Sequence, residues 1–257
     1  MAGTTGGRLA GKVAIVTGAA KGQGAGVARA FAAEGARVML LDVLDEAGEA
    51  VAAAIRASGG TARFRRCDVS REEDVSAATE AAVAEYGGLD VLYSNAAVIS
   101  YGNRIADMPV AQWDRTIAIN LRGPFLCAKH ALPHLVVRGG GAIINVSSHG
   151  AFQAAPVGVA DYATAKGGLV TLTYYLASEY GSSNVRANCI APGPIPTDLN
   201  APFLGTPEGR AQTAMFIPLG RVGEIDDVAR AAVFLASDEA KWISGAVLRV
   251  DGGIVVQ

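Results

Sequence analysis

The chain has 257 residues, a formal net charge of −2 and 51% hydrophobic residues. It contains neither a polybasic run nor an apolar run long enough to cross a bilayer, which argues against nucleic acid and membranes as partners. Three widely separated cysteines indicate a reducing compartment rather than a disulfide framework. The polar, Gly-rich start lacks the apolar core of a signal peptide. We therefore expect a cytoplasmic protein with a flexible tail at residues 1–10 and a single domain at residues 11–257.

Short β-branched runs alternate with amphipathic helical stretches along the chain. Helices are expected at Gly24–Glu34, Glu46–Ala57 and Glu72–Tyr86, and a longer one at 110–136. This alternation predicts an α/β fold, a single-domain, Rossmann-like, doubly wound parallel sheet of about seven strands with helices on both faces. The predicted strands are Val13–Thr17, Arg37–Asp42, Ala62–Arg66, Leu89–Tyr93, Ala142–Val146, Val185–Ile190 and Val247–Val250.

One interval breaks this alternation, because six prolines fall between Pro192 and Pro218. Proline lacks a backbone donor and interrupts long regular elements. Long loops in compact domains often cover binding sites. We therefore expect a substrate lid at about 194–217, with a short helix near Thr206–Ala214.

The first predicted strand leads directly into three glycines, Gly18, Gly22 and Gly24, and then into a helix. Glycine permits a tight turn and the close approach of a pyrophosphate, while the helix N-terminus presents free N–H groups. The spacing differs from the common Gly-x-Gly-x-x-Gly fingerprint, and 32 glycines are scattered along the chain. The position after the first strand nevertheless predicts a dinucleotide site.

Two residues, Asp42 and Lys21, indicate opposite choices between NAD and NADP. Asp42 ends the second predicted strand, where a carboxylate accepts both adenosine-ribose hydroxyls and repels a 2′-phosphate. Two like charges 4 Å apart cost about 4 kcal/mol at an effective dielectric of 20. Lys21 in the glycine loop favours a phosphate instead. The position of Asp42 favours NAD over NADP; capping of the next helix is its alternative role.

Further cofactor contacts are expected where the third and fourth strands end. Asp68 could bind the adenine amino group or cap the helix that begins near Arg71, and Ser70 competes for that capping role. Asn95-Ala96-Ala97 follows the fourth strand, where small residues would let the backbone approach the cofactor, although an ordinary turn would look the same.

Tyr162 and Lys166 lie four residues apart on one face of a predicted helix. Lowering the pKa of a tyrosine by about three units requires roughly 4 kcal/mol, which an adjacent ammonium and a positively charged nicotinamide can supply. Ser148 follows the fifth strand, at the edge where sites form in open α/β sheets, and competes there with Ser147. A tyrosine and a lysine at this spacing are common in helices and indicate little alone. The serines at the end of the fifth strand make a catalytic role for the pair the better interpretation.

Asn120 lies in the long predicted helix, four residues before Pro124. Because proline has no N–H, the Asn120 carbonyl loses its helical partner and should find water. We hypothesise that this water connects Lys166 to solvent in a proton relay.

Together these motifs resemble the short-chain dehydrogenase/reductase family from about residue 9 onward. The matches are Thr-Gly-x-x-x-Gly-x-Gly at 17–24, Asn-Ala at 95–96, Asn120, Ser148, Tyr-x-x-x-Lys at 162–166 and Pro192-Gly193. The resemblance implies that Tyr162 is the general acid/base and that Lys166 binds the nicotinamide ribose and lowers the tyrosine pKa. It also implies that Ser148 orients the substrate, that Asn120 maintains the relay, and that the long helices around 110–137 and 163–180 build a homotetramer.

The complete set of cofactor contacts predicted in this way lies along the carboxyl ends of the strands. It comprises Gly18, Lys21, Gly22, Gln23, Gly24, Asp42, Val43, Asp68, Val69, Asn95, Ala96, Ala97, Tyr162, Lys166, Pro192, Gly193, Ile195 and Thr197. The chain departs from the family pattern at Ser94, at Ala97 and at Gln23, which stands where an aliphatic residue is commoner. His149, next to Ser148, could face the substrate, but a structural or solvent-facing role is the interpretation that we prefer.

The sequence therefore predicts an oxidoreductase that moves hydride between NAD(H) and a small-molecule substrate, a secondary alcohol or ketone, with no metal. One alternative, favoured by Lys21, is an NADPH-dependent carbonyl or 3-oxoacyl reductase. An alternative of another class is a dinucleotide-sensing binding protein without catalysis, which the intact set of Asn120, Ser148, Tyr162 and Lys166 opposes.

Overall fold

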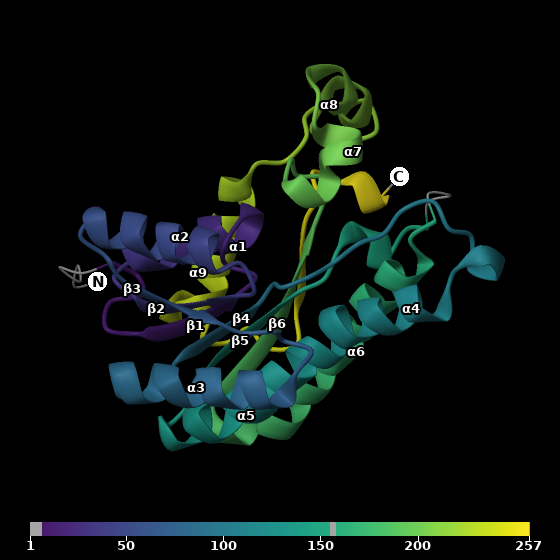
Figure 1. Ribbon diagram of the computed structural model, residues 1–257. Helices are drawn as coiled ribbons and strands as arrows, with labels where there is room; N and C mark the ends of the chain where they lie inside the picture. The colour runs from purple at the N-terminus through teal and green to yellow at the C-terminus, as the bar shows by residue number, and fades with distance from the viewer. Residues whose placement is uncertain (1–6, 155–157, 257) are drawn as a thin grey trace.

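Seven parallel strands form one sheet at the centre of the computed structural model, which describes residues 7–154 and 158–256 (Figure 1). The strand order is β3-β2-β1-β4-β5-β6-β7. All seven predicted strands are confirmed, with ends displaced by at most two residues. Their bounds are β1 Val13–Thr17, β2 Arg37–Asp42, β3 Thr61–Arg66, β4 Val91–Ser94, β5 Gly141–Val146, β6 Val185–Pro192 and β7 Val247–Val250.

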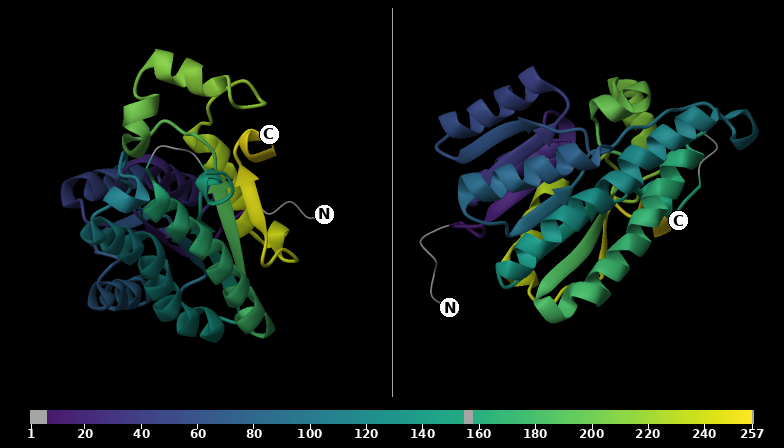
Figure 2. Two further views of the ribbon diagram at one scale, coloured as in Figure 1. Left: turned by 90° about the vertical axis from the view of Figure 1, so that its right-hand side faces the viewer. Right: turned by 60° about the horizontal axis from the view of Figure 1, so that its bottom comes forward.

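Helices cover both faces of the sheet, as expected for parallel strands buried on two sides (Figures 1 and 2). Helices α1 (Gly22–Ala33), α2 (Asp45–Ala57) and α9 (Ile225–Ala236) pack on one face. Helices α3 (Glu72–Tyr86), α5 (Gly123–Val137) and α6 (Ala160–Tyr180) pack on the other. Strand β1 supplies both cores alternately, since Ala14 and Val16 join the first and Val13 and Ile15 the second. The doubly wound fold class is confirmed.

The long helix expected at 110–136 is wrong in one respect, because it is not continuous. It consists of α4 (Val110–Ile117), a π-helical turn (Ala118–Arg122) and α5, which begins at Gly123. The Gly123 N–H donates to the Ala118 carbonyl, five residues back. Pro124 has no N–H to donate, so the wider turn falls where the regular ladder is interrupted.

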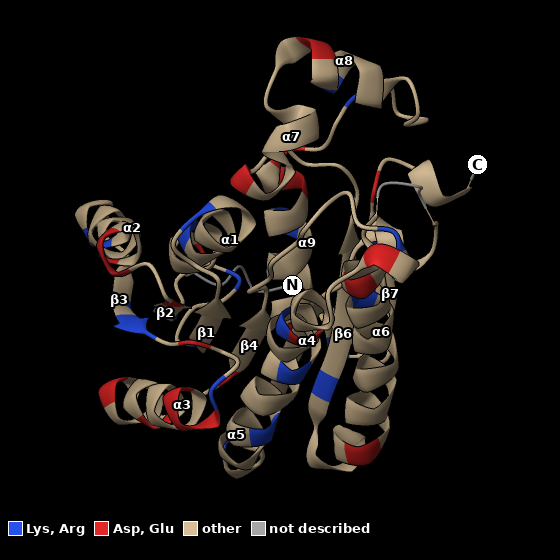
Figure 3. Ribbon diagram, turned by 45° about the vertical axis from the view of Figure 1, so that its right-hand side comes forward, with Lys and Arg blue, Asp and Glu red and all other residues tan. Residues whose placement is uncertain are grey.

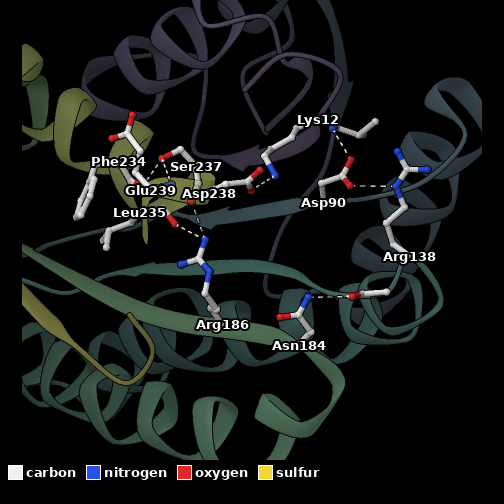
Figure 4. A network of polar contacts seen from close by, with 12 residues as sticks. Lys12, Asp90, Arg138, Asn184, Arg186, Phe234, Leu235, Ser237, Asp238 and Glu239 are labelled. Atoms are coloured by element: carbon white, nitrogen blue, oxygen red, sulfur yellow. Dashed lines mark hydrogen bonds and ion pairs between the residues drawn. The ribbon is translucent and has the colours of Figure 1, made fainter. Parts of the chain in front are cut away.

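The amino ends of the strands are closed by polar contacts between distant segments (Figure 4). Arg186 on β6 donates to the carbonyls of Leu235 and Ser237, and Lys12 pairs with Asp238 at 2.8 Å. Burial lowers the pKa of Arg186. Part of the expected tail also packs here: Leu9 is fully buried and Arg8 bonds Glu239. Of residues 1–10, then, 7–10 belong to the folded domain, and 1–6 lie outside the described residues.

Charged residues link helix α3 to helix α5 beside it (Figure 3). Glu72 on α3 accepts from Lys129 at 2.6 Å and from His130 at 3.1 Å, and His134 pairs with Glu80. The histidines at 130 and 134 thus bond carboxylates on the neighbouring helix. Among residues 7–154 and 158–256, no helix combines the length and hydropathy that a membrane span requires.

The proline-rich interval forms a small helical lobe that projects beyond the carboxyl edge of the sheet (Figure 1). It contains a 3₁₀ turn at Asp198–Asn200, α7 (Ala201–Leu204) and α8 (Pro207–Ala214). The short helix expected near residues 206–214 is α8, whereas α7 was not foreseen. The remaining 3₁₀ turns are Ile105–Asp107, His149–Ala151, Gly181–Ser183, Asp238–Ala240 and Ile254–Val256.

Candidate active site

The strand order reverses between β1 and β4, and at this point the glycine loop meets the end of β4. The Thr17 hydroxyl accepts from the backbone N–H groups of Asn95 and Ala96. The Asn95 side chain donates back to the carbonyls of Thr17 and Gly18, at 3.1 and 3.2 Å. Open α/β sheets bind ligands at such a switch point. Asn95 therefore fixes the floor of the site, which is a structural role beyond the predicted cofactor contact.

The glycine loop has the geometry that a pyrophosphate requires. Gly18 and Gly22 have φ values of +63° and +53°, in the left-handed region that glycine tolerates. A Cβ at Gly24 would lie 2.1 Å from the Gly18 carbonyl oxygen. Helix α1 starts directly after this loop and, among the described residues, its N-cap Lys21 makes no side-chain capping bond. The first N–H groups of α1 are thus available to an anion, so the loop fits a dinucleotide.

Asp42 lies against this loop at the end of β2. One carboxylate oxygen accepts from the Ala20 N–H at 2.9 Å, and the other accepts from the N–H groups of Val43 and Leu44. Helix α2 starts later, at Asp45, with Leu44 as its N-cap. The alternative role of Asp42 as a helix cap is therefore wrong. Lys21 pairs with Asp198 of the lobe at 3.3 Å.

The two capping roles considered at the end of β3 are also wrong. Helix α3 has Arg71 as its N-cap, with no side-chain capping bond in the described part of the chain. Asp68 instead accepts from both the N–H and the hydroxyl of Ser70, at 2.9 and 2.7 Å. This local turn holds the Asp68 carboxylate at the carboxyl edge of the sheet.

Tyr162 and Lys166 lie on the first turns of α6, with the lysine side chain directed under the tyrosine. The Lys166 ammonium donates to the Val146 carbonyl at 2.6 Å and lies 5.5 Å from the centroid of the Tyr162 ring. Only 2% of Lys166 is exposed. Ser147 donates to the Lys166 carbonyl at 2.7 Å, and Ser148 follows β5 beside Tyr162. Ser147 therefore supports α6, while Ser148 meets the tyrosine.

The pKa values of the pair differ from the expectation. Burial raises the pKa of Tyr162 to about 12, although a hydrogen bond with Ser148 lowers it in part. Burial also lowers the pKa of Lys166 to about 8. The expected lowering of the tyrosine pKa is thus not found in the protein alone, because desolvation disfavours the charged forms of both groups.

Asn120 is fully buried in the π-helical turn, and both polar atoms of its side-chain amide bond the backbone of Val98. Its amide donates to the Val98 carbonyl at 2.7 Å, and its Oδ1 accepts from the Val98 N–H at 2.8 Å. This paired bond holds the segment that follows β4. The sequence argument considered only the Asn120 carbonyl, so it missed this side-chain role.

Two residues that the cofactor and catalytic predictions omitted also border this site. The Tyr101 hydroxyl bonds the Leu199 carbonyl and the Asn200 side chain, at 3.3 and 3.2 Å, and its ring packs edge-on against Phe203 at 5.0 Å. The His149 Nδ1 donates to the Pro192 carbonyl at 3.3 Å, and burial lowers the pKa of His149. The sequence signal that could have pointed to Tyr101 is an aromatic residue with a hydroxyl in the loop after β4.

The remaining predicted contacts come to the same carboxyl edge. A Cβ at Gly22 would lie 3.3 Å from the Thr197 side chain, and one at Gly193 would lie 2.7 Å from the Asp251 Cα. The buried Oε1 of Gln23 has no hydrogen-bond partner among the described residues. Pro192 and Gly193 stand at the end of β6, and Ile195 is fully buried. Both Gly193 and Pro194 line a cavity of about 520 Å³ beside the lobe.

Comparison with known proteins agrees with this geometry. A family model described as enoyl-(acyl carrier protein) reductase matches residues 18–255. The chain is 44% identical to cis-4-hydroxycyclohexanecarboxylate dehydrogenase of Sinomonas cyclohexanicum over 94% of this chain and 96% of that protein. It is 42% identical to D-threitol dehydrogenase of Mycolicibacterium smegmatis over 97% and 95% of the two chains.

A solved structure supports the same assignment. The short-chain type dehydrogenase/reductase from Mycobacterium ulcerans superposes with a TM-score of 0.91 and 33% identity, covering 96% of this chain and 90% of that one. Fold, site geometry and full-length similarity therefore agree, and the chain belongs to the short-chain dehydrogenase/reductase family of oxidoreductases.

Proposed function

We propose that this protein is an NAD-dependent dehydrogenase that interconverts a secondary alcohol and its ketone. The observation that carries the proposal is the group formed by Tyr162, Ser148 and Lys166 at the carboxyl edge of the sheet, beside the glycine loop. A phenol, a hydroxyl and a buried ammonium at one place are the groups that proton transfer to and from an alcohol oxygen requires.

In the proposed oxidation, the Tyr162 phenolate accepts the proton of the substrate hydroxyl while Ser148 holds the same oxygen by a hydrogen bond. In the reduction, the Tyr162 phenol returns that proton to the ketone oxygen. A nicotinamide ring, when bound, would supply the hydride acceptor or donor. Lys166 contributes positive charge next to the phenol. Asn120 orders the segment that follows β4, and we propose that a water at its backbone carbonyl connects Lys166 to solvent.

The glycine loop, the start of α1 and Asp42 are the groups proposed to hold the dinucleotide. Free N–H groups at the start of α1 would meet the pyrophosphate. The two curated relatives are named for substrates of different kinds, a cyclic hydroxy acid and an acyclic polyol, so they support the reaction class rather than one substrate.

The direct test is a screen of secondary alcohols, cyclic and acyclic, with NAD⁺, followed by the absorbance of NADH. Turnover of at least one alcohol is the expected result. Dinucleotide binding without turnover across the panel, and across the matching ketones with NADH, would favour a sensing protein instead.

We expect Asp42 to determine the choice of NAD, because its carboxylate stands at the end of β2 against the glycine loop. The Asp42→Ser variant should shift the ratio of kcat/KM for NADP⁺ over NAD⁺ upward by at least about 10-fold, since removal of one like charge relieves several kcal/mol at close range. The matched control is Lys21→Ala, which removes the opposite charge and should not raise that ratio. A wild-type preference for NADP⁺ would refute this role.

We further propose a cytoplasmic homotetramer built through α4, α5 and α6. Helices α5 and α6 leave large side chains exposed, among them Phe125, Tyr174 and Tyr175, and an interface would bury such side chains. Light scattering coupled to gel filtration should give about four times the chain mass of 26.2 kDa. A monomeric mass at micromolar concentration would exclude the assembly.

A further inference from the structure

A buried carboxylate immediately precedes Tyr162 in the sequence and has no part in the proposed proton transfer. Asp161 is fully buried in the first turn of α6. One of its oxygens accepts from the Tyr162 backbone N–H at 2.8 Å. The other accepts from the Thr116 hydroxyl at 2.7 Å and from the Gln112 side-chain amide at 3.1 Å. All three partners are donors that belong to the protein, so the carboxylate is anchored within it.

The contacts of Asp161 extend across α4 to the loop that follows β4. Gln112 and Thr116 both belong to α4, one helical turn apart. The side-chain oxygen Oε1 of Gln112 accepts in turn from the Asn103 side-chain amide at 2.7 Å. The chain of bonds therefore runs from Asn103 through Gln112 to Asp161 and ends on the backbone of Tyr162.

We infer that Asp161 is a positioning residue that fixes the Tyr162 backbone, and with it the hydroxyl that the proposed function places on the substrate oxygen. The N–H groups in the first turn of a helix lack partners within the helix, so that turn is free to fray unless something binds it. Asp161 accepts from the Tyr162 N–H and is itself held by Thr116 and Gln112 of helix α4. Displacements of about 1 Å can cost 10²-fold in rate, so this anchor affects catalysis without touching the substrate.

This inference rests on the proposed function, but one of its measurements does not. In Asp161→Ala, hydrogen exchange of the backbone amides in the first turn of α6 should accelerate at least about 10-fold, whether or not the protein is a dehydrogenase. With an alcohol from the screen, kcat should fall by about 10²-fold, while the KM for NAD⁺ changes less than about threefold. Failure of the screen itself would refute the proposed function and leave the exchange result to judge the anchor.

Conservative variants separate positioning from general loss of structure. Asp161→Asn keeps an oxygen for the Tyr162 N–H, and reversal of the Gln112 and Asn103 amides can restore the other bonds, so this variant should keep kcat within about 10-fold of the wild type. Thr116→Val removes a single hydrogen bond to Asp161, so its kcat should lie between those of the two Asp161 variants. Asp114→Ala on the exposed face of α4 is the matched control.

Two results would overturn the inference. The first is an Asp161→Ala protein with wild-type amide exchange in the first turn of α6 and wild-type kcat. The second, if Asp161→Ala does not fold, is a folded Thr116→Val protein with wild-type amide exchange in the first turn of α6 and wild-type kcat.

Discussion

Replacement of Tyr162 by phenylalanine is expected to lower kcat by about 10³-fold while leaving the affinity for NADH within about threefold. General acid–base catalysis typically contributes 10²–10⁴-fold, and the variant removes only the hydroxyl that meets Ser148. The ring stays in place over Lys166, 5.5 Å from its ammonium. Steady-state rates from NADH absorbance and binding from NADH fluorescence provide the two measurements.

The same helix supplies the matched control for this experiment. Tyr174 lies on α6 with about half of its side chain exposed, and Tyr174→Phe keeps the ring that we propose for the subunit interface, so this variant should retain wild-type rates. Unchanged turnover in Tyr162→Phe would remove the catalytic assignment altogether. A loss of NADH binding equal to the loss of rate would show instead that the hydroxyl serves the cofactor site.

The parts of the fold that were predicted correctly depend on local patterns. Strand β1 and the glycine turn after it follow from a β-branched run and from backbone conformations that only glycine adopts freely, as the φ of +63° at Gly18 illustrates. The alternation of apolar residues in β1 between the two cores follows from the period of a strand. Such signals need no knowledge of what packs where.

The parts that were missed depend on contacts between distant segments. Asp161 is unremarkable as an acidic residue at the start of a helix, and only the packing of α4 against α6 buries it among three donors. Asn120 likewise gains its role from the Val98 backbone, 22 residues away. Leu9 was assigned to a tail because the first ten residues are polar and Gly-rich as a group, yet the space beside α1 buries it completely.

Local reasoning also failed where two side chains competed for one backbone group. Asp68 and Ser70 both suit a helix cap, but they bond each other in a turn before α3 begins. Similarly, the raised pKa of Tyr162 reflects its depth in the protein, which the spacing of four residues to Lys166 does not encode. The candidate site residues were thus predicted from the sequence, whereas the environment that surrounds them came from the structure.

Lys166→Met should abolish measurable turnover and yet stabilise the fold. Burial lowers the pKa of Lys166 from 10.5 to about 8, so keeping this ammonium at pH 7 costs about 3 kcal/mol of folding free energy. The variant loses the bond to the Val146 carbonyl, worth about 1 kcal/mol. The free energy of unfolding at pH 7 should therefore rise by about 1–2 kcal/mol, measured by urea denaturation.

The pH dependence of that difference identifies its cause. Between pH 8 and 10.5 the unfolded chain binds a proton at Lys166 that the folded protein has released, so this group makes the wild type more stable as pH rises through that window. Cys189, whose pKa burial raises to about 11, acts in the opposite direction above pH 9, and Tyr162 does so above pH 10. Both residues are present in wild type and variant, so their effects largely cancel in the comparison. The stability advantage of Lys166→Met should accordingly shrink from pH 7 to pH 10, and an advantage that stays constant would show that buried charge is not its source.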